Sequence, residues 1–136
     1  MAVAFYGVDP TSSLASVSIG GRVEICWGGP GLTYTKQTLT QNAAGARHFS
    51  IVDVDKDGWL DLYVVYHALN IVVCWYIGPN RVAKEKIILQ QYLSPVWVVS
   101  ADMDNNGFPD AVISLMDSEL IIIVLNLNGK VIFLAF

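Results

Sequence analysis

The amino-acid sequence predicts an all-β protein made of repeated four-stranded antiparallel units. Short apolar and β-branched segments alternate with Gly, Pro, Asn and Asp, which is the pattern of strands joined by turns. No stretch carries the sustained 3.6-residue periodicity of an amphipathic helix. The acidic segment Asp53–Asp61 returns 49 residues later as Asp102–Asp110, so the chain repeats one structural unit.

The repeat divides the chain into three units. The second and third units each contain one copy of the acidic segment. The first unit is degenerate, because its corresponding loop, Phe5–Ser13, keeps only Asp9 and has Pro10 in place of the glycine. We therefore expect units at residues 1–48 (without a metal site), 49–97 and 98–136.

Each unit is predicted to form four strands. The first unit has Ala2–Tyr6, Leu14–Ile19, Arg22–Trp27 and Tyr34–Leu39. The second has His48–Val52, Leu62–His67, Ile71–Ile77 and Lys84–Gln90. The third has Val96–Ala101, Ala111–Leu115, Leu120–Leu125 and Lys130–Phe136.

Sheets of this kind, repeated every 45–49 residues, indicate the blades of a β-propeller. Several strands are apolar on both faces, as expected of sheets stacked between neighbours, since one such sheet cannot bury both faces alone. A β-sandwich produced by duplication is the alternative. The fixed place of the acidic loop, between the first and second strands of a unit, favours the blades.

The acidic loops have the spacing Asp-x-Asp-x-Asp-Gly-x-x-Asp. Side chains at positions one, three and five converge if the backbone curls sharply, and glycine at position six permits that turn. Calcium takes six to eight oxygen ligands in irregular geometry, whereas magnesium prefers a strict octahedron and zinc prefers His or Cys. The predicted calcium ligands of loop one are Asp53, Asp55, Asp57, the Trp59 carbonyl and Asp61, and those of loop two are Asp102, Asp104, Asn106, the Phe108 carbonyl and Asp110.

Loop two is expected to bind calcium more weakly, because it has one carboxylate fewer. The alternative interpretation is that both loops are ordinary acidic turns, since Asp, Asn and Gly favour turns for local reasons. Charge clustering argues against it: seven of the 12 acidic residues lie in these two nine-residue windows. Two calcium ions would bring the formal net charge from -4 to zero.

Composition excludes several classes of protein. Hydrophobic residues make up 54% of the chain and charged residues 15%, which excludes intrinsic disorder. Eight scattered Lys and Arg residues do not build a nucleic-acid-binding patch. The longest unbroken apolar run, Ile71–Ile77, is too short for a membrane-spanning helix. The first residues, Met1–Gly7, lack the basic start of a secretory signal peptide, so either the chain is not secreted by this route or the signal was removed before this numbering begins.

Nothing in the sequence predicts catalysis. The two histidines, His48 and His67, share no motif with a serine or a cysteine. The Gly-x-Ser-x-Gly and Gly-x-x-x-x-Gly-Lys motifs are absent. Paired carboxylates can act as acid and base in polysaccharide cleavage, but their spacing here is that of metal loops. We therefore expect a non-enzymatic protein and keep a polysaccharide-active enzyme as a distant alternative.

The cysteines and tryptophans are expected to be structural. Two cysteines are too few for a disulfide scaffold. The segments around Cys26 and Cys74 resemble each other, and the alignment places both free thiols at one position of successive units. It also makes Trp27 and Trp75 equivalent, which predicts packing between blades. Trp59 lies inside a loop, where packing is the first interpretation and stacking on a sugar ring the second.

The two loops, their strand context and the trailing Trp-Gly-Gly-Pro-Gly and Trp-Tyr-Ile-Gly-Pro-Asn segments resemble FG-GAP/VCBS-type repeats, the calcium-loop blades of integrin-like propellers. The resemblance is clear for units two and three and weak for unit one. It implies structural calcium and an extracellular or cell-surface role in adhesion, lectin-like recognition or scaffolding. The Phe-Gly and Gly-Ala-Pro signatures of integrin blades are absent, so only the blade type is implied.

Three blades do not close a ring, because propellers have about four to eight. Their outer faces would stay exposed, and exposed apolar faces mark interaction surfaces. We expect self-association, first as a homodimer that closes a six-bladed ring and second as a head-to-tail filament. A segment of a larger propeller is the third option. A glycan or another surface protein is a further expected partner, whereas nucleic acid and a membrane span are not expected.

Overall fold

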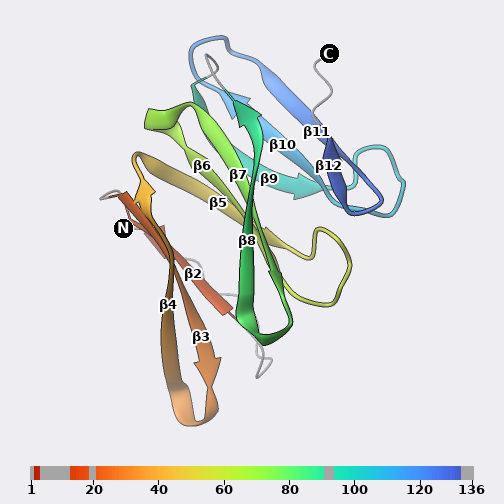
Figure 1. Ribbon diagram of the computed structural model, residues 1–136. Coiled ribbons are helices and arrows are strands. Elements are labelled where there is room, and N and C mark those ends of the chain that lie inside the picture. Colours follow the sequence, from red (N-terminus) through yellow and green to blue (C-terminus); the bar gives the residue numbers. More distant parts are fainter. Residues whose placement is uncertain (1, 4–12, 19–20, 91–93, 133–136) are drawn as a thin grey trace.

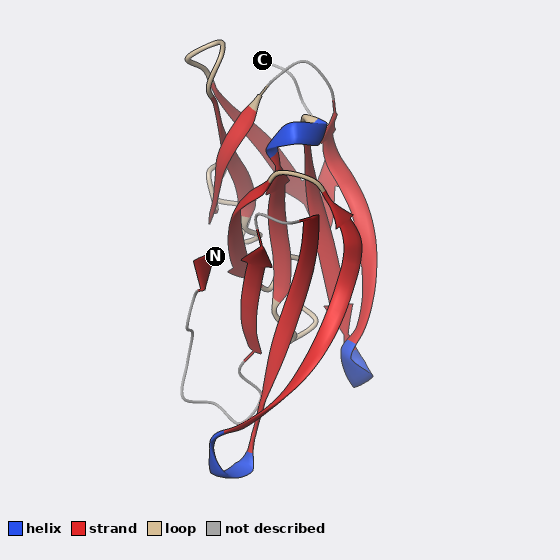
Figure 2. Cartoon of the chain, turned by 90° about the vertical axis from the view of Figure 1, so that its left-hand side faces the viewer, coloured by secondary structure: helices blue, strands red, loops and turns tan. Residues whose placement is uncertain are grey.

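The computed structural model describes residues 2–3, 13–18, 21–90 and 94–132. These residues form three four-stranded antiparallel sheets, and each sheet keeps its strands in chain order. The all-β prediction is therefore confirmed. Three one-turn 3-10 helices lie at the tips of hairpins: η1 (Pro30–Leu32), η2 (His67–Leu69) and η3 (Pro79–Arg81) (Figure 2).

The first sheet consists of β1 (Ala2–Val3), β2 (Ser13–Ser18), β3 (Gly21–Gly29) and β4 (Thr33–Ala43). The second consists of β5 (Ala46–Val52), β6 (Asp61–Tyr66), β7 (Ile71–Gly78) and β8 (Val82–Gln90). The third consists of β9 (Pro95–Ala101), β10 (Asp110–Leu115), β11 (Ile121–Leu127) and β12 (Lys130–Ile132).

These strands occupy the twelve predicted places, with ends that differ by a few residues. The β3–β4 hairpin is longer than expected, since β4 continues to Ala43. Parts of three predicted strands, residues 4–6, 19 and 133–136, lie outside the described residues, as does most of the degenerate loop Phe5–Ser13.

The sheets pack face to face in chain order, as blades of a propeller do (Figure 1). Alternation along β6 shows how one strand serves two interfaces. Leu62 and Val64 lie in the core between the first and second sheets. Tyr63 and Val65 lie in the core between the second and third sheets. All four side chains are buried, which explains why the strand is apolar on both faces.

The first strands of the second and third sheets lie against each other. The Ser50 and Ser100 hydroxyl oxygens are 3.0 Å apart, and the Val98 amide donates to Nδ1 of His48 at 3.3 Å. The His48 and Trp97 rings stack with centroids 3.6 Å apart. No helix among the described residues is long and apolar enough to cross a membrane.

The expected equivalence of the cysteines is wrong by one residue. Both hairpin tips follow a glycine that pairs across the turn, Gly29 with Thr33 and Gly78 with Val82. Counted from these glycines, Cys26 corresponds to Trp75. The cause is the spacing between the second and third strands. Three residues separate the paired Ser18 and Arg22 in the first sheet, whereas four separate the paired Tyr66 and Ile71 in the second.

The same shift makes Trp27 equivalent to Tyr76. Trp27 and Trp75 nevertheless pack in the same core, from opposite sheets, so their predicted packing role is confirmed. Cys26 is half-buried, Cys74 is buried, and both are free thiols.

Candidate metal centre

The acidic loops connect β5 to β6 and β9 to β10 with the same backbone conformation. Position four is left-handed in both loops, with φ of 60° at Lys56 and 59° at Asn105. Position six has φ of 90° at Gly58 and 89° at Gly107, a region that favours glycine. The predicted reason for the glycine is therefore correct in both copies.

Three carboxylates converge in each loop. Asp53, Asp55 and Asp61 each offer an oxygen, and these oxygens lie within 4.8 Å of one another. The equivalent residues of loop two, Asp102, Asp104 and Asp110, form a second such group.

The side chains at position five serve the backbone of the loop. An Asp57 oxygen accepts a hydrogen bond from the Trp59 amide at 2.8 Å. The Asn106 side-chain oxygen accepts from the Phe108 amide at 2.7 Å. Asp57 is thus placed on the loop but outside the group of three carboxylates. Trp59 is half-buried.

The aspartate at position nine joins three parts of its sheet. Oδ2 of Asp61 accepts from the Val54 amide at 2.8 Å, and Oδ1 accepts from the Ile77 amide on β7 at 2.7 Å. Asp110 repeats this arrangement with the amides of Met103 and Asn126, both at 2.7 Å. Position nine therefore fixes the loop to the second and third strands of its own sheet.

Burial raises the pKa of Asp61 to about 7, although the Ile77 and Val54 amides act in the opposite direction. Burial and the neighbouring charge of Asp57 also raise the pKa of Asp55. Both shifts show that the negative charges of loop one are poorly compensated by the protein itself.

The donors of loop one fit a hard cation. Oδ2 of Asp53 accepts from the Gly58 amide at 3.0 Å, but Oδ1 is buried and has no hydrogen-bond partner among the described residues. A buried carboxylate oxygen without a donor is costly unless a positive charge faces it. Carboxylate oxygens are the ligands that calcium and magnesium prefer, and the flexible ligand number of calcium suits a loop of this kind.

Loop one is covered by the third sheet, whereas loop two is open. Val54, at position two of loop one, is fully buried between the second and third sheets. The equivalent Met103 is 50% exposed. The β11–β12 turn also lies against loop one, since a Cβ added to Gly129 would be 3.1 Å from Cβ of Asp55.

Comparison with protein-family models gives a match at residues 53–113, to the model described as FG-GAP-like repeat. This part of the chain is similar to an FG-GAP-like repeat. The match begins at the first acidic residue of loop one and ends in β10, so it contains both loops. The resemblance drawn from the loops is confirmed. No curated protein and no solved structure matches the chain.

Asn126 is a residue of the loop-two site that the sequence reasoning missed. It is fully buried, and its side-chain amide donates to the Val54 carbonyl at 2.7 Å and to the Pro109 carbonyl at 3.1 Å. The main-chain carbonyl of Asn126 accepts a hydrogen bond from the Asn106 side-chain amide at 2.9 Å. Asn126 thereby connects loop two to loop one across the repeat. The available signal was a lone amide side chain in the otherwise apolar β11.

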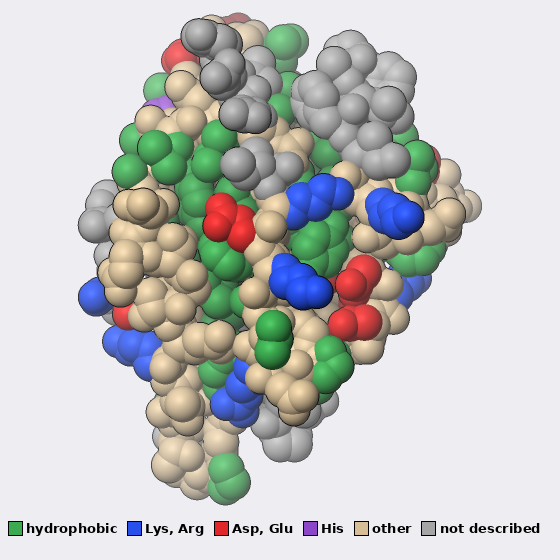
Figure 3. Space-filling model, in the orientation of Figure 1, with side chains coloured by type: hydrophobic (Ala, Val, Ile, Leu, Met, Phe, Trp, Pro, Cys, Tyr) green, Lys and Arg blue, Asp and Glu red, His purple; other side chains and the backbone are tan. Residues whose placement is uncertain are grey.

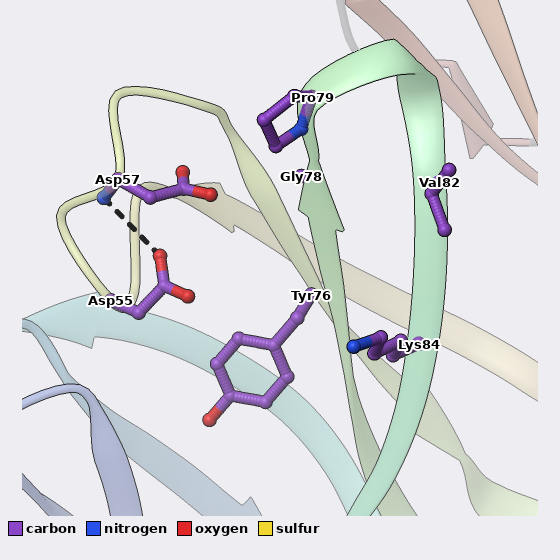
Figure 4. A pocket seen from close by; sticks show the side chains of 7 residues that line it. All are labelled: Asp55, Asp57, Tyr76, Gly78, Pro79, Val82 and Lys84. Carbon is purple, nitrogen blue, oxygen red and sulfur yellow. Dashed lines mark hydrogen bonds between the residues drawn. The ribbon is translucent and has the colours of Figure 1, made fainter.

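A pocket of about 300 Å³ lies beside loop one (Figure 4). The carboxylates of Asp55 and Asp57 point from the loop into the space before the Gly78–Pro79 turn, with Tyr76 and Lys84 below (Figure 4). Figure 3 shows that hydrophobic, basic and acidic side chains lie next to one another on the face seen in Figure 1. The pocket therefore combines acidic, aromatic and basic groups.

Proposed function

We propose that the chain is a non-enzymatic, calcium-binding β-propeller repeat module with a structural or adhesive role outside the cell. One observation carries the proposal: two acidic loops, equivalent in the repeat, each gather three carboxylates in one conformation. The unpartnered Asp53 oxygen and the raised pKa of Asp61 support a cation in loop one. The FG-GAP-like repeat supports the calcium and the extracellular setting.

In this proposal Asp53, Asp55, Asp57, the Trp59 carbonyl and Asp61 hold calcium in loop one. The corresponding set in loop two is Asp102, Asp104, Asn106, the Phe108 carbonyl and Asp110. Bound calcium supplies the positive charge that the clustered carboxylates lack. It also stabilises the folded state, because only the folded loop presents the oxygens together.

Calorimetric titration of the calcium-free protein tests the proposal. Two binding events are expected, and the weaker one belongs to loop two. Asp55→Asn should remove the loop-one event and Asp104→Asn the loop-two event, while Glu85→Gln, an exposed acid outside both loops, should leave both unchanged. If the wild-type chain takes up no calcium and its melting temperature ignores EGTA, the proposal is wrong. Equal affinities in the two loops would contradict the ranking alone.

We further propose that the module self-associates, as a dimer or as a filament. The exposed apolar side chains of the third sheet support this, among them Ile121 at 69% exposure and Trp97 at 54%. Light scattering with and without EGTA measures the particle size. A monomer under both conditions would exclude self-association and leave the calcium proposal intact.

Carbohydrate binding is the second candidate function, and the pocket beside loop one favours it. Tyr76 offers an aromatic surface there, and Asp57 and Lys84 offer polar partners for hydroxyl groups. A glycan array with wild-type protein, Tyr76→Ala and Trp59→Ala tests this role. Reproducible binding that either substitution removes would support a lectin. An empty array would leave the structural role as the better explanation.

A further inference from the structure

We propose that the outer face of the third sheet is a docking surface for the same face of a second copy of this chain, paired about a two-fold axis. The inference deepens the proposed self-association and rests on it. We call this surface the outer third face. Its residues are Val99, Val112, Ile121, Ile123 and Leu125, with Trp97 at the edge strand β9, where its ring also stacks on His48 of the second sheet.

The repeat shows what this face does elsewhere in the molecule. On β7, Val72 and Cys74 are fully buried against the third sheet. The residues 49 positions later are Ile121 and Ile123 on β11. Ile121 is 69% exposed, so a position that is a sheet-to-sheet contact in the second sheet is exposed to solvent in the third.

The inner strand and the loop repeat the comparison. His48 and Ser50 on β5 contact the third sheet through Val98 and Ser100. Their equivalents on β9 are Trp97 and Val99, which are 54% and 43% exposed. Both equivalents are more apolar than the residues they replace. Met103, the counterpart of the buried Val54, is also exposed.

The partner must be apolar. The outward residues of β9, β10 and β11 that define the outer third face carry no charge, and the cation on the same side, Lys130, lies on the outermost strand β12. Apolar side chains gain free energy when they leave water, and a charged partner surface would lose its hydration on contact.

The described part of the first sheet's outer face does not match this requirement. Val23 and Ile25 face the second sheet, so Glu24 between them faces outward. Nε of Arg22 and Nζ of Lys36 lie 3.5 and 3.4 Å from the Glu24 carboxylate. Glu24 is already buried, but the Arg22 and Lys36 side chains are exposed, and docking the outer third face here would take these two charges out of water against apolar side chains, at a large desolvation cost.

The outer third face is chemically complementary to itself. The side chains of the outer third face that this pairing would bury, among them Ile121 and Trp97, carry no charge. Such an interface is isologous and closes at two chains. The geometry thus favours a two-fold dimer through the third sheets over the six-bladed ring, which would join the third sheet of one copy to the first sheet of the other.

Light scattering of four calcium-loaded proteins tests this mode of pairing. The wild type should have twice the mass of the 14.9 kDa chain. Ile121→Lys should be a monomer, because the charge would be buried in the dimer but is solvated in the single chain. Leu69→Lys, at an apolar site that is 44% exposed on η2, is the matched control and should remain a dimer. Arg22→Trp, on the outer face of the first sheet, should also remain a dimer.

Unfolding curves of the variants verify that each is folded, since all three substitutions are at exposed positions. A dimer that survives Ile121→Lys but not Arg22→Trp would overturn the two-fold mode while preserving self-association. Particles larger than a dimer would overturn it in favour of a filament, and a wild-type monomer would overturn it as well. Calcium titration of Ile121→Lys separately tests the proposed metal sites, which do not depend on the dimer.

Discussion

Replacing Asp61 with alanine should destabilise the protein even when no calcium is present. The carboxylate accepts hydrogen bonds from the Val54 and Ile77 amides at 2.8 and 2.7 Å, and the residue is 1% exposed. Alanine leaves both buried amides without an acceptor, at a cost of about 1–3 kcal/mol each. Part of this loss is offset, because the substitution also removes the free-energy cost of burying the carboxylate, whose pKa is raised by burial to about 7. We expect a net loss of about 2–4 kcal/mol.

Urea unfolding in EGTA measures this loss, with Asp57→Ala as the control from the same loop. Within the described part of the chain, the Asp57 carboxylate accepts a hydrogen bond only from the Trp59 amide, at an exposed site where water can replace it. Asp57→Ala should therefore change the calcium-free stability by less than about 0.5 kcal/mol and reduce only the stabilisation gained on adding calcium. If Asp61→Ala matched the wild type in EGTA, position nine would be a metal ligand alone and the structural role argued from its two hydrogen bonds would be refuted.

Three further predictions concern loop one and its contact with the third sheet. Because the pKa of Asp61 is raised in the folded state, the folded calcium-free chain keeps a proton between about pH 4 and 7 that the unfolded chain releases. Calcium-free stability should therefore fall as pH rises through this window. The calcium affinity measured by calorimetry should weaken up to tenfold for each pH unit below about 7, because the proton competes with the metal. Val54→Ala should lower the free energy of unfolding, measured in urea, by about 1–3 kcal/mol, whereas Met103→Ala in the monomer should lower it by less than about 0.5 kcal/mol. Equal losses would contradict the difference in burial between the two side chains. Gly129→Ala should cost about 1–2 kcal/mol, because φ is 77° and the new Cβ would lie 3.1 Å from Cβ of Asp55; an unchanged melting temperature would contradict this close approach.

Local signals made the strands and the loop conformation predictable. Alternating apolar residues and turn residues act over a few positions, so the strands follow from neighbouring residues. The turn at Gly58 is equally local, since its φ of 90° is a property of one residue. The all-β fold and the shape of the acidic loops could therefore be derived without tertiary contacts.

The sequence did not predict the features that depend on distant partners. The sequence predicted Asp61 as a metal ligand only. It did not predict the hydrogen bond that Asp61 accepts from the Ile77 amide, because Ile77 lies 16 residues away on another strand. Asn126 and the Val54 carbonyl are 72 residues apart, and no pattern within either segment announces their contact. The register of Cys26 and Cys74 was wrong because one extra turn residue shifts a strand without altering its composition.

The third sheet covers loop one, and this has a thermodynamic consequence for any ion held there. Val54 and Asp55 are in contact with the third sheet, so the packing of that sheet and the binding of calcium in loop one are thermodynamically coupled. Coupling of this kind is reciprocal: whatever factor the docked sheet adds to the calcium affinity, calcium adds to the docking equilibrium. Loop two has no such cover, as the exposed Met103 shows. Its affinity therefore lacks this contribution as well as one carboxylate, and an ion in any loop of such an array reports whether the next sheet is in place.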